Sequence, residues 1–147
     1  MTTDTLLKQL PYGTDFLFVD SISQLSEEGI TGHFRFKPEL YFYKSHFMDR
    51  PVTPGVILIE CMAQIGLVCL GIYLLSNQET NTQSLETNIA LSTTEIEFFK
   101  PVYPGEKVTV VSEKEYFRFG KLKCKVKMMN EQNELVSKGS ISGMILK

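Results

Sequence analysis

Short segments in which apolar and polar residues alternate surround one long apolar run in the middle of the chain. Alternation is clearest from Gly29 to Lys37, and this two-residue period predicts a half-buried strand. Its apolar face carries Ile30, Gly32, Phe34 and Phe36. The run from Gly55 to about Ser76 is apolar on nearly all sides, which predicts one long helix enclosed by the rest of the fold.

The other predicted elements are separated by proline, glycine and polar residues. A helix is expected from Thr3 to Gln9, capped by Thr3 or Asp4. Residues 38–54 hold three prolines and are expected to be irregular, and the polar stretch from Asn77 to Asn88 is expected to be an exposed loop. Strands are predicted at Asp15–Ser21, Ile89–Lys100, Lys107–Phe119, Lys121–Met129 and Glu134–Leu146. One dominant helix with five or six strands and short connections predicts an α+β fold, in which an antiparallel sheet wraps around the helix.

Size and composition fit a single domain over residues 1–147. The chain is 43% hydrophobic and 22% charged, which is ordinary globular usage, and its 147 residues leave no room for a separate cofactor-binding domain. The net charge of −2 is too small for a general nucleic-acid binder. Three cysteines, an odd number, lie among apolar residues, and no secretory signal opens the chain. We therefore expect buried, reduced thiols at Cys61, Cys69 and Cys124 in a cytoplasmic protein.

The run from Val56 to Leu75 is nearly long enough to span a bilayer. Glu60 and Gln64 lie within it, one helical turn apart, and no Lys or Arg occurs from residue 51 to residue 99 to anchor its ends. We therefore expect a core helix and no membrane span.

Charge is distributed unevenly along the chain. Residues 1–99 carry five basic against twelve acidic residues, whereas residues 100–147 carry ten against five. Within the basic part, four lysines alternate with apolar residues on one predicted strand, so their amines share one face. These are Lys121, Lys123, Lys125 and Lys127. They either discourage pairing with other strands or dock an acidic partner, and the pattern leaves both explanations open.

Glu60 is a candidate for chemistry because it lies in the apolar helix. Loss of water raises the pKa of a carboxyl group and makes it a proton donor near neutral pH. Alternatively, the side chain reaches solvent and interacts with the positive end of the helix dipole. Gln64 lies one turn further along the same face. One interpretation is that the Gln64 side chain holds Glu60 or a water molecule in place. The alternative is that its amide is buried in the core and hydrogen-bonds to backbone groups.

His46 precedes the helix in a segment rich in aromatic residues and proline. A neutral imidazole accepts a proton near cytosolic pH, and Gly55 at the helix N-terminus offers a free backbone N–H to a developing oxyanion. A packed, inert histidine is the alternative. His33 lies on the polar face of its strand, so we expect it to be exposed and not catalytic. Nucleotide-binding, zinc-peptidase and serine-hydrolase motifs are missing, so no metal or nucleotide is expected.

The segment from Ser45 to Gln64, SHFMDRPVTPGVILIECMAQ, resembles the active-site segment of the hot-dog-fold 3-hydroxyacyl-acyl-carrier-protein dehydratases of type II fatty acid synthesis, which are FabZ-like. The family pattern reads G-H-F-P-G-x-P-x-x-P-G-V, then a short apolar run, then E-A-x-A-Q. Further similarity covers Leu10–Asp20 and Phe98–Glu106, and so most of the chain. The resemblance implies a single hot-dog domain.

By position, the resemblance implies that His46 is the catalytic base, Glu60 the acid and the Gly55 N–H the donor to the thioester oxygen. The reaction would eliminate water from a (3R)-3-hydroxyacyl thioester to give a trans-2-enoyl product. The supporting residues would be Phe47, Pro54, Val56 and Gln64.

The resemblance also implies partners. No cofactor is bound by the protein, because the acyl group travels on the phosphopantetheine of an acidic acyl carrier protein, for which the four lysines are candidate docking residues. In this family the His and Glu of one site come from different protomers. A homodimer with shared sites is therefore implied, and a trimer of dimers is a larger option.

Several positions depart from the family pattern and affect the loop after His46 and the docking surface. They are Tyr12, Gly13, Ser45, Met48, Asp49, Glu97 and Phe99. These changes favour a specialised relative, for example in a polyketide or aryl-polyene pigment pathway. Two other functions stay open: a hot-dog acyl thioesterase, which the order of His46 and Glu60 disfavours, and a non-catalytic acyl-carrier binding domain.

Overall fold

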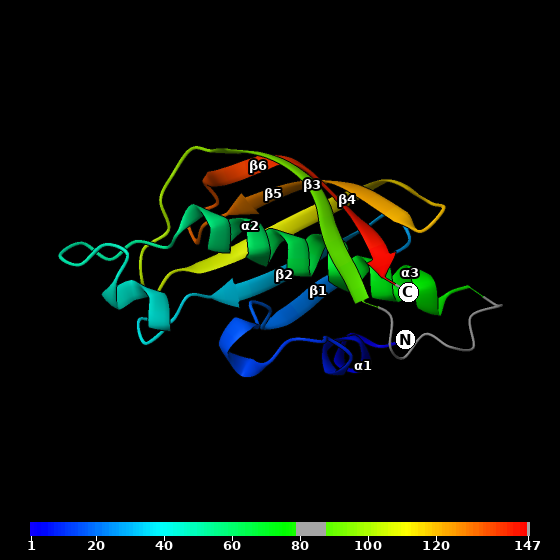
Figure 1. The fold of residues 1–147 in the computed structure, drawn as a ribbon, viewed down its shortest axis with the longest axis horizontal. Helices are drawn as coiled ribbons and strands as arrows, with labels where there is room; N and C mark the ends of the chain where they lie inside the picture. Colours follow the sequence, from blue (N-terminus) through cyan, green and yellow to red (C-terminus); the bar gives the residue numbers. More distant parts are fainter. Residues whose placement is uncertain (79–87, 147) are drawn as a thin grey trace.

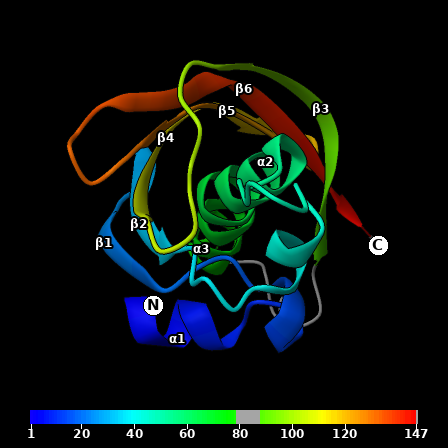
Figure 2. The same ribbon diagram turned by 90° about the vertical axis from the view of Figure 1, so that its left-hand side faces the viewer.

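Six antiparallel strands form one curved sheet around a long helix (Figure 1 and Figure 2). The computed structural model describes residues 1–78 and 88–146. The strands are β1 (Ser21–Leu25), β2 (Gly29–Arg35), β3 (Asn88–Phe98), β4 (Lys107–Arg118), β5 (Lys121–Met129) and β6 (Leu135–Leu146). Their order in the sheet is β1-β2-β4-β5-β6-β3, so β1 and β3 are the edges. The predicted α+β fold, with a sheet wrapped around a helix, is confirmed.

The central helix runs without a break from Gly55 to Ser76, as predicted. It consists of α2 (Gly55–Ala63), a π-helical segment η3 (Gln64–Cys69) and α3 (Leu70–Ser76). The π-helical segment was not predicted. Within it, the Gly66 carbonyl accepts a hydrogen bond of 2.8 Å from the Ser112 hydroxyl on β4. A helix that widens by one residue leaves such carbonyls to side-chain donors.

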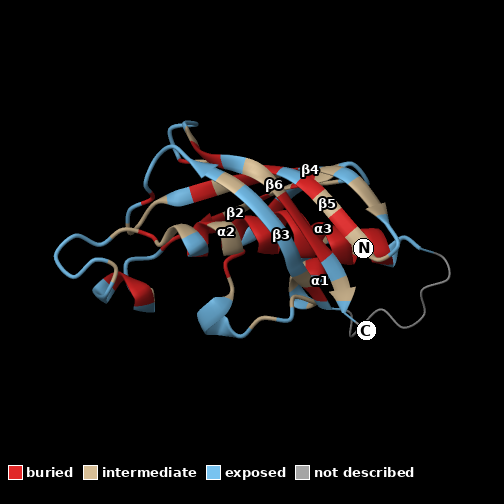
Figure 3. Ribbon diagram, turned by 45° about the horizontal axis from the view of Figure 1, so that its top comes forward, coloured by how far each residue is buried: buried red, intermediate tan, exposed pale blue. Residues whose placement is uncertain are grey.

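The helix is buried by the sheet on most of its surface (Figure 3). It is long and apolar enough to cross a membrane, but 78% of its most apolar stretch is buried inside the protein. It is therefore the core helix that we expected and not a span. The three cysteines are free and buried, also as expected.

The β5 strand runs antiparallel to the helix, which fixes which lysine lies near which helical turn. Gly66 packs against Val126, and further along the helix Gly71 packs against Leu122. Positions of higher number on β5 therefore lie closer to the helix N-terminus. The alternation predicted for Gly29–Lys37 is confirmed, because Ile30, Gly32, Phe34 and Phe36 are all buried.

The predicted strand at Asp15–Ser21 is wrong. A short 3-10 helix, η1 (Thr14–Phe16), stands there instead, followed by an irregular stretch, and β1 begins only at Ser21. The reason is that the Phe18 backbone bonds to the helix and not to a strand. Its N–H donates to the Gln64 side chain at 2.8 Å, and its carbonyl accepts from the Cys61 thiol at 3.4 Å.

The remaining boundaries agree with prediction within a few residues. The N-terminal helix α1 (Thr3–Lys8) is capped by Thr2 and not by Thr3 or Asp4 as predicted, because the Thr2 hydroxyl accepts from the Thr5 N–H. Residues 38–54 are irregular apart from the 3-10 helix η2 (Tyr41–Lys44). Most of the predicted loop Asn77–Asn88 lies outside the described residues.

Replacement of Gly139 by alanine tests the pairing of β6 with the edge strand β3. A Cβ atom at this position would overlap the backbone carbonyl oxygen of Glu95 on β3. We expect Gly139→Ala to lower the free energy of unfolding by about 3 kcal/mol in urea denaturation. Gly13→Ala is the control, because a Cβ atom at Gly13 would meet no other atom within 4 Å, and it should change stability by less than about 1 kcal/mol. A stable Gly139→Ala protein would contradict this close approach.

Candidate active site

The helix N-terminus is formed by Pro54 and Gly55. Pro54 is the N-cap residue, and its carbonyl accepts hydrogen bonds from the N–H groups of Ile57 and Leu58 at 2.9 and 3.2 Å. The first N–H groups of a helix, here those of Gly55 and Val56, have no partner within the helix and carry its positive partial charge. An oxygen that gains negative charge would be stabilised at this point.

Gly55 also lets an aromatic ring approach the helix start. A Cβ at Gly55 would lie 3.3 Å from the Phe98 ring, closer than side chains ordinarily pack. Phe98 ends β3, far from Gly55 in the sequence, and sequence reasoning assigned it no role. The two residues line a cavity of about 340 Å³ together with Val52, Thr53, Leu58, Phe99, Lys100 and Pro101.

His46 is half-buried and held in a defined orientation. Its Nδ1 lies 2.9 Å from the Val52 carbonyl oxygen, and its ring stacks on Phe47 with 4.2 Å between centroids. A carbonyl only accepts hydrogen bonds, so Nδ1 carries the proton in the neutral ring and Nε2 is left as an acceptor. The side chain is thus in the tautomer that a base requires.

Glu60 is held by a fully buried glutamine. The Gln64 Nε2 donates to Glu60 Oε2 at 2.9 Å and to the Phe16 carbonyl at 2.8 Å, while Oε1 accepts from the Phe18 N–H. Gln64 therefore both positions Glu60 and satisfies backbone groups, so the two predicted alternatives hold together. Burial raises the pKa of Glu60, and the hydrogen bond from Gln64 opposes that shift in part.

Tyr12 lies in the electrostatic field of Glu60 and was noted from the sequence only as a departure from the family pattern. Burial raises the pKa of Tyr12, and the nearby charge of Glu60 raises it further. The phenol thus stays protonated beside the carboxyl group. Only long-range packing brings the two together, and no local sequence signal indicated it.

Tyr43 and Thr53 brace the segment that leads into the helix. The Tyr43 hydroxyl lies 2.6 Å from Thr53 Oγ1, and burial raises the pKa of Tyr43 to about 12. The Thr53 N–H donates to the Val102 carbonyl at 2.9 Å. These bonds tie the residues just before Pro54 to the chain that follows β3.

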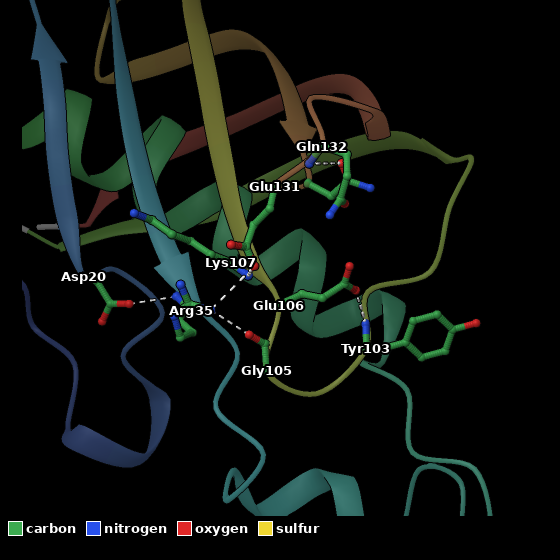
Figure 4. Close-up of polar contacts among 9 residues, drawn as sticks. Asp20, Arg35, Tyr103, Gly105, Glu106, Lys107, Glu131 and Gln132 are labelled. Carbon is green, nitrogen blue, oxygen red and sulfur yellow. Dashed lines mark hydrogen bonds and ion pairs between the residues drawn. The ribbon is translucent and has the colours of Figure 1, made fainter.

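That chain is itself fixed by polar contacts at the end of β2 (Figure 4). The Arg35 guanidinium donates to the Gly105 carbonyl at 2.7 Å and pairs with Glu131 at 3.5 Å. Glu131 also accepts from the Lys107 N–H, and the Arg35 N–H donates to Asp20. The turn around Gly105 is thereby anchored, and with it the Val102 carbonyl that holds Thr53.

Two of the three candidate groups, the Gly55 N–H and Glu60, lie on different sides of the helix. Gly55 faces Phe98 and the chain after β3, whereas Glu60 is turned toward Tyr12 and the segment around Phe16. In the described part of the protomer no hydrogen bond joins His46 to Glu60.

Large apolar side chains are exposed in the segment that leads into the helix, in the first helical turn, and at and after the end of β3. Met48 is 87% and Val56 72% exposed. The others in these segments are Tyr41, Phe47, Phe98, Phe99 and Tyr103. Exposed apolar patches are typical of surfaces that contact another molecule.

The remaining candidates are distributed as follows. His33 lies on the outward face as predicted, but it is half-buried between Thr109 and Ser23, at 3.0 and 2.9 Å. Lys123 and Lys125 both pair with Glu115. Over residues 1–78 and 88–146, no group of three or more acidic, histidine or cysteine side chains could hold a metal.

Comparison with known proteins gives a consistent result. The family model described as a FabA-like domain matches residues 10–142. A "3-hydroxyacyl-[acyl-carrier-protein] dehydratase FabZ" from Petrotoga mobilis is 33% identical over 108 residues, which cover 74% of this chain and 72% of the relative. Its counterpart from Geotalea uraniireducens is 30% identical over 121 residues, covering 82% and 80%.

Solved structures share the fold at low identity. The dehydratase heterocomplex ApeI:P from Xenorhabdus doucetiae superposes with a TM-score of 0.76 at 10% identity, covering 100% of this chain and 93% of that one. The thioesterase HI1161 from Haemophilus influenzae gives 0.71 at 15% identity, covering 100% and 92%. Both the dehydratase and the thioesterase have this architecture, so these likenesses establish the hot-dog fold alone.

The raised pKa of Glu60 makes a prediction for stability. An acid whose pKa is higher in the folded state destabilises that state once the pH exceeds its ordinary value of 4.5, because the unfolded chain loses the proton more easily. Glu60→Gln should therefore be more stable than the wild type near neutral pH. The gain should disappear at about pH 4, where both states are protonated. Urea denaturation at fixed protein concentration measures this, and an equal gain at both pH values would contradict a titrating cause.

Proposed function

The chain belongs to the FabA-like family and matches FabZ dehydratases over most of its length, and we propose that it removes water from 3-hydroxyacyl groups carried on an acyl carrier protein. It is a hydro-lyase of fatty acid or related biosynthesis. The observation that carries this proposal is that one helix presents two groups suited to the reaction. They are the unpaired backbone N–H at Gly55 and the half-buried Glu60 carboxyl group, which is held by Gln64.

The proposed chemistry uses three groups. His46 Nε2 takes the proton from the carbon next to the thioester carbonyl, and the Gly55 N–H stabilises the oxygen of the resulting enolate. The bond from the third carbon to its hydroxyl then breaks, and Glu60 gives its proton to the departing oxygen. Water and a trans-2-enoyl thioester leave, and a proton passes back from His46 to Glu60 to restore the enzyme.

We propose that the groups around these three support the reaction without a bound metal or nucleotide. Phe47 stacks on the base, Pro54 begins the helix and Gln64 orients the acid. The acyl group would be held as a (3R)-3-hydroxyacyl thioester on the phosphopantetheine of its carrier, in the cytoplasm.

We propose a homodimer in which each site takes His46 and Gly55 from one protomer and Glu60 from the other. Two observations support it. His46 and Glu60 do not bond within the described residues of one chain, and the side chains of Val56, in the first helical turn, and Met48, in the preceding segment, are largely exposed. A second copy would cover that surface and complete the site. A trimer of such dimers is the larger assembly that we propose as an alternative.

Loss of either proton-transfer group should stop the reaction. We expect His46→Ala and Glu60→Gln each to lower the rate by roughly 10²- to 10⁴-fold. The measurement is mass spectrometry of a panel of 3-hydroxyacyl carriers, in which dehydration removes one water from the acyl group. Loss of the whole acyl group would instead reveal a thioesterase, and full activity of either variant would exclude the assignment.

A mixture of the two inactive variants tests whether the sites are shared. In a mixed dimer, the His46 of one chain meets the Glu60 of the other in one intact site. Unfolding and refolding the two variants together should therefore recover about a quarter of the wild-type rate, since half of the dimers are mixed and each has one working site. Sites formed within one protomer would recover no activity.

The four candidate docking lysines are not equivalent in the structure. Lys127 lies on the part of β5 nearest the helix N-terminus, and its neighbour on β6 is Lys138. The Lys138 ammonium lies 5.9 Å above the Phe99 ring, and Phe99 and Lys100 line the cavity at Gly55. Lys121, by contrast, is about 20 Å further along the strand. We propose that the acidic carrier docks mainly at the Lys127 end.

Charge reversal at the two ends of β5 separates these positions. Lys127→Glu should raise the KM for a carrier-bound substrate by about fivefold or more, with little change in kcat, because docking is weakened but chemistry is not. The matched variant Lys121→Glu should leave this KM near the wild-type value. A small thioester without a carrier serves as the control substrate, and an equal effect of Lys127→Glu on it would contradict a docking role.

A further inference from the structure

The turn between β4 and β5 carries an aromatic side chain that the fold does not use. Phe119, in this turn, is 95% exposed. The turn between β4 and β5 lies at the end of the sheet away from the start of α2 (Figure 1). The φ of Phe119 is +52° and that of Gly120 is +72°. Two-residue hairpin turns of this kind favour Asn, Asp or Gly at the first position, and a bulky residue is strained there. Packing and turn geometry would both be served better by a small polar residue.

Two cations flank this aromatic residue without a carboxylate partner. Arg118 and Lys121 are directly opposite each other in the ladder of β4 and β5, an arrangement that is repulsive for like charges. Among the described residues no carboxylate oxygen lies within 4 Å of either side chain. The Arg118 guanidinium lies 4.6 Å above the Tyr116 ring, and Arg118 is exposed. The turn therefore has a local positive charge.

Aliphatic side chains at the end of β6 extend the same region. Met144 is the partner of Lys121 in the β5–β6 ladder, and the Ile145 N–H donates to the Gly120 carbonyl at 2.9 Å. Met144 is 48% and Leu146 54% exposed. We call this region the turn surface; it consists of Arg118, Phe119, Lys121, Met144 and Leu146.

We propose that the turn surface binds the anionic face of a lipid bilayer. An aromatic ring at a protruding turn, flanked by cations and aliphatic side chains, has the composition of an interfacial anchor, in which the ring enters the headgroup region and the cations meet lipid phosphates. Five side chains are few for a stable protein interface, which buries at least about 1,000 Å². A bilayer is fluid and needs no matching shape.

The location of the turn surface is compatible with catalysis. It lies beside Leu122 and the last turns of the helix, since Leu122 packs against Gly71. The helix start at Gly55 is about 24 Å away along the axis. Binding of the turn to a membrane would leave the other end of the protein free for the carrier. The proposal does not depend on the dehydratase activity and fails or succeeds separately from it.

Vesicle sedimentation tests the proposal. The full chain should bind vesicles of equimolar phosphatidylcholine and phosphatidylglycerol, should bind pure phosphatidylcholine weakly, and should be released by salt. Phe119→Asn should weaken binding by about fivefold or more while its unfolding transition is unchanged or raised, because Asn suits the positive φ. Arg118→Gln with Lys121→Gln should remove the preference for the anionic vesicles. Lys127→Gln, on the same strand face, should bind them like the wild type.

Three results would overturn the proposal. The first is a wild-type protein that stays in solution with the anionic vesicles at low salt. The second is a folded Phe119→Asn protein that sediments with them as the wild type does. The third is a change of oligomeric state in Phe119→Asn without lipid, which would show that a second copy of the chain covers the turn surface.

Discussion

The buried side chain of Gln64 is the contact on which the arrangement of the site depends. Its amide makes three hydrogen bonds, to the Phe18 N–H, the Phe16 carbonyl and the Glu60 carboxyl. A fully buried amide without these partners would cost several kcal/mol, at about 1–3 kcal/mol for each unsatisfied group. The same contact therefore fixes the N-terminal segment to the helix and fixes the orientation of the proposed acid. Stability and chemistry are linked through one residue.

The other half of the site depends on the approach of β3 and the chain after it to the helix start. Phe98 can lie against the helix only because residue 55 has no side chain, and the Thr53 N–H is held by the Val102 carbonyl. Arg35 anchors this chain from the end of β2. The N–H groups at Gly55 are therefore presented by a rigid frame, and a preorganised donor loses no energy to reorganisation when charge develops.

Local periodicity was enough to predict the central helix and most of the strands. The alternation along Gly29–Lys37 and the apolar run from Gly55 both reflect which residues of one segment are buried. Such patterns can be recognised in the sequence of that segment alone. The structure of Asp15–Ser21 could not be predicted in this way, because Phe18 takes its hydrogen-bond partners from residues more than 40 positions away. Tyr12 and Phe98 reach the site only through such tertiary contacts. The roles of His46, Glu60 and Gly55 followed from a family motif together with plausible chemistry, and they remain predictions for experiment.

The π-helical segment at Gln64–Cys69 separates the core helix into two parts with different requirements. The first part must present Glu60 to the N-terminal segment, and the last part must place Gly71 against Ile89 and Leu122. A uniform α-helix fixes the rotation of one part relative to the other at about 100° per residue. A π-helical turn contains one extra residue, and it therefore changes the rotation of the last part of the helix relative to the first. The wider segment therefore lets Glu60 face the N-terminal segment while Gly71, on the same helix, faces Ile89 and Leu122.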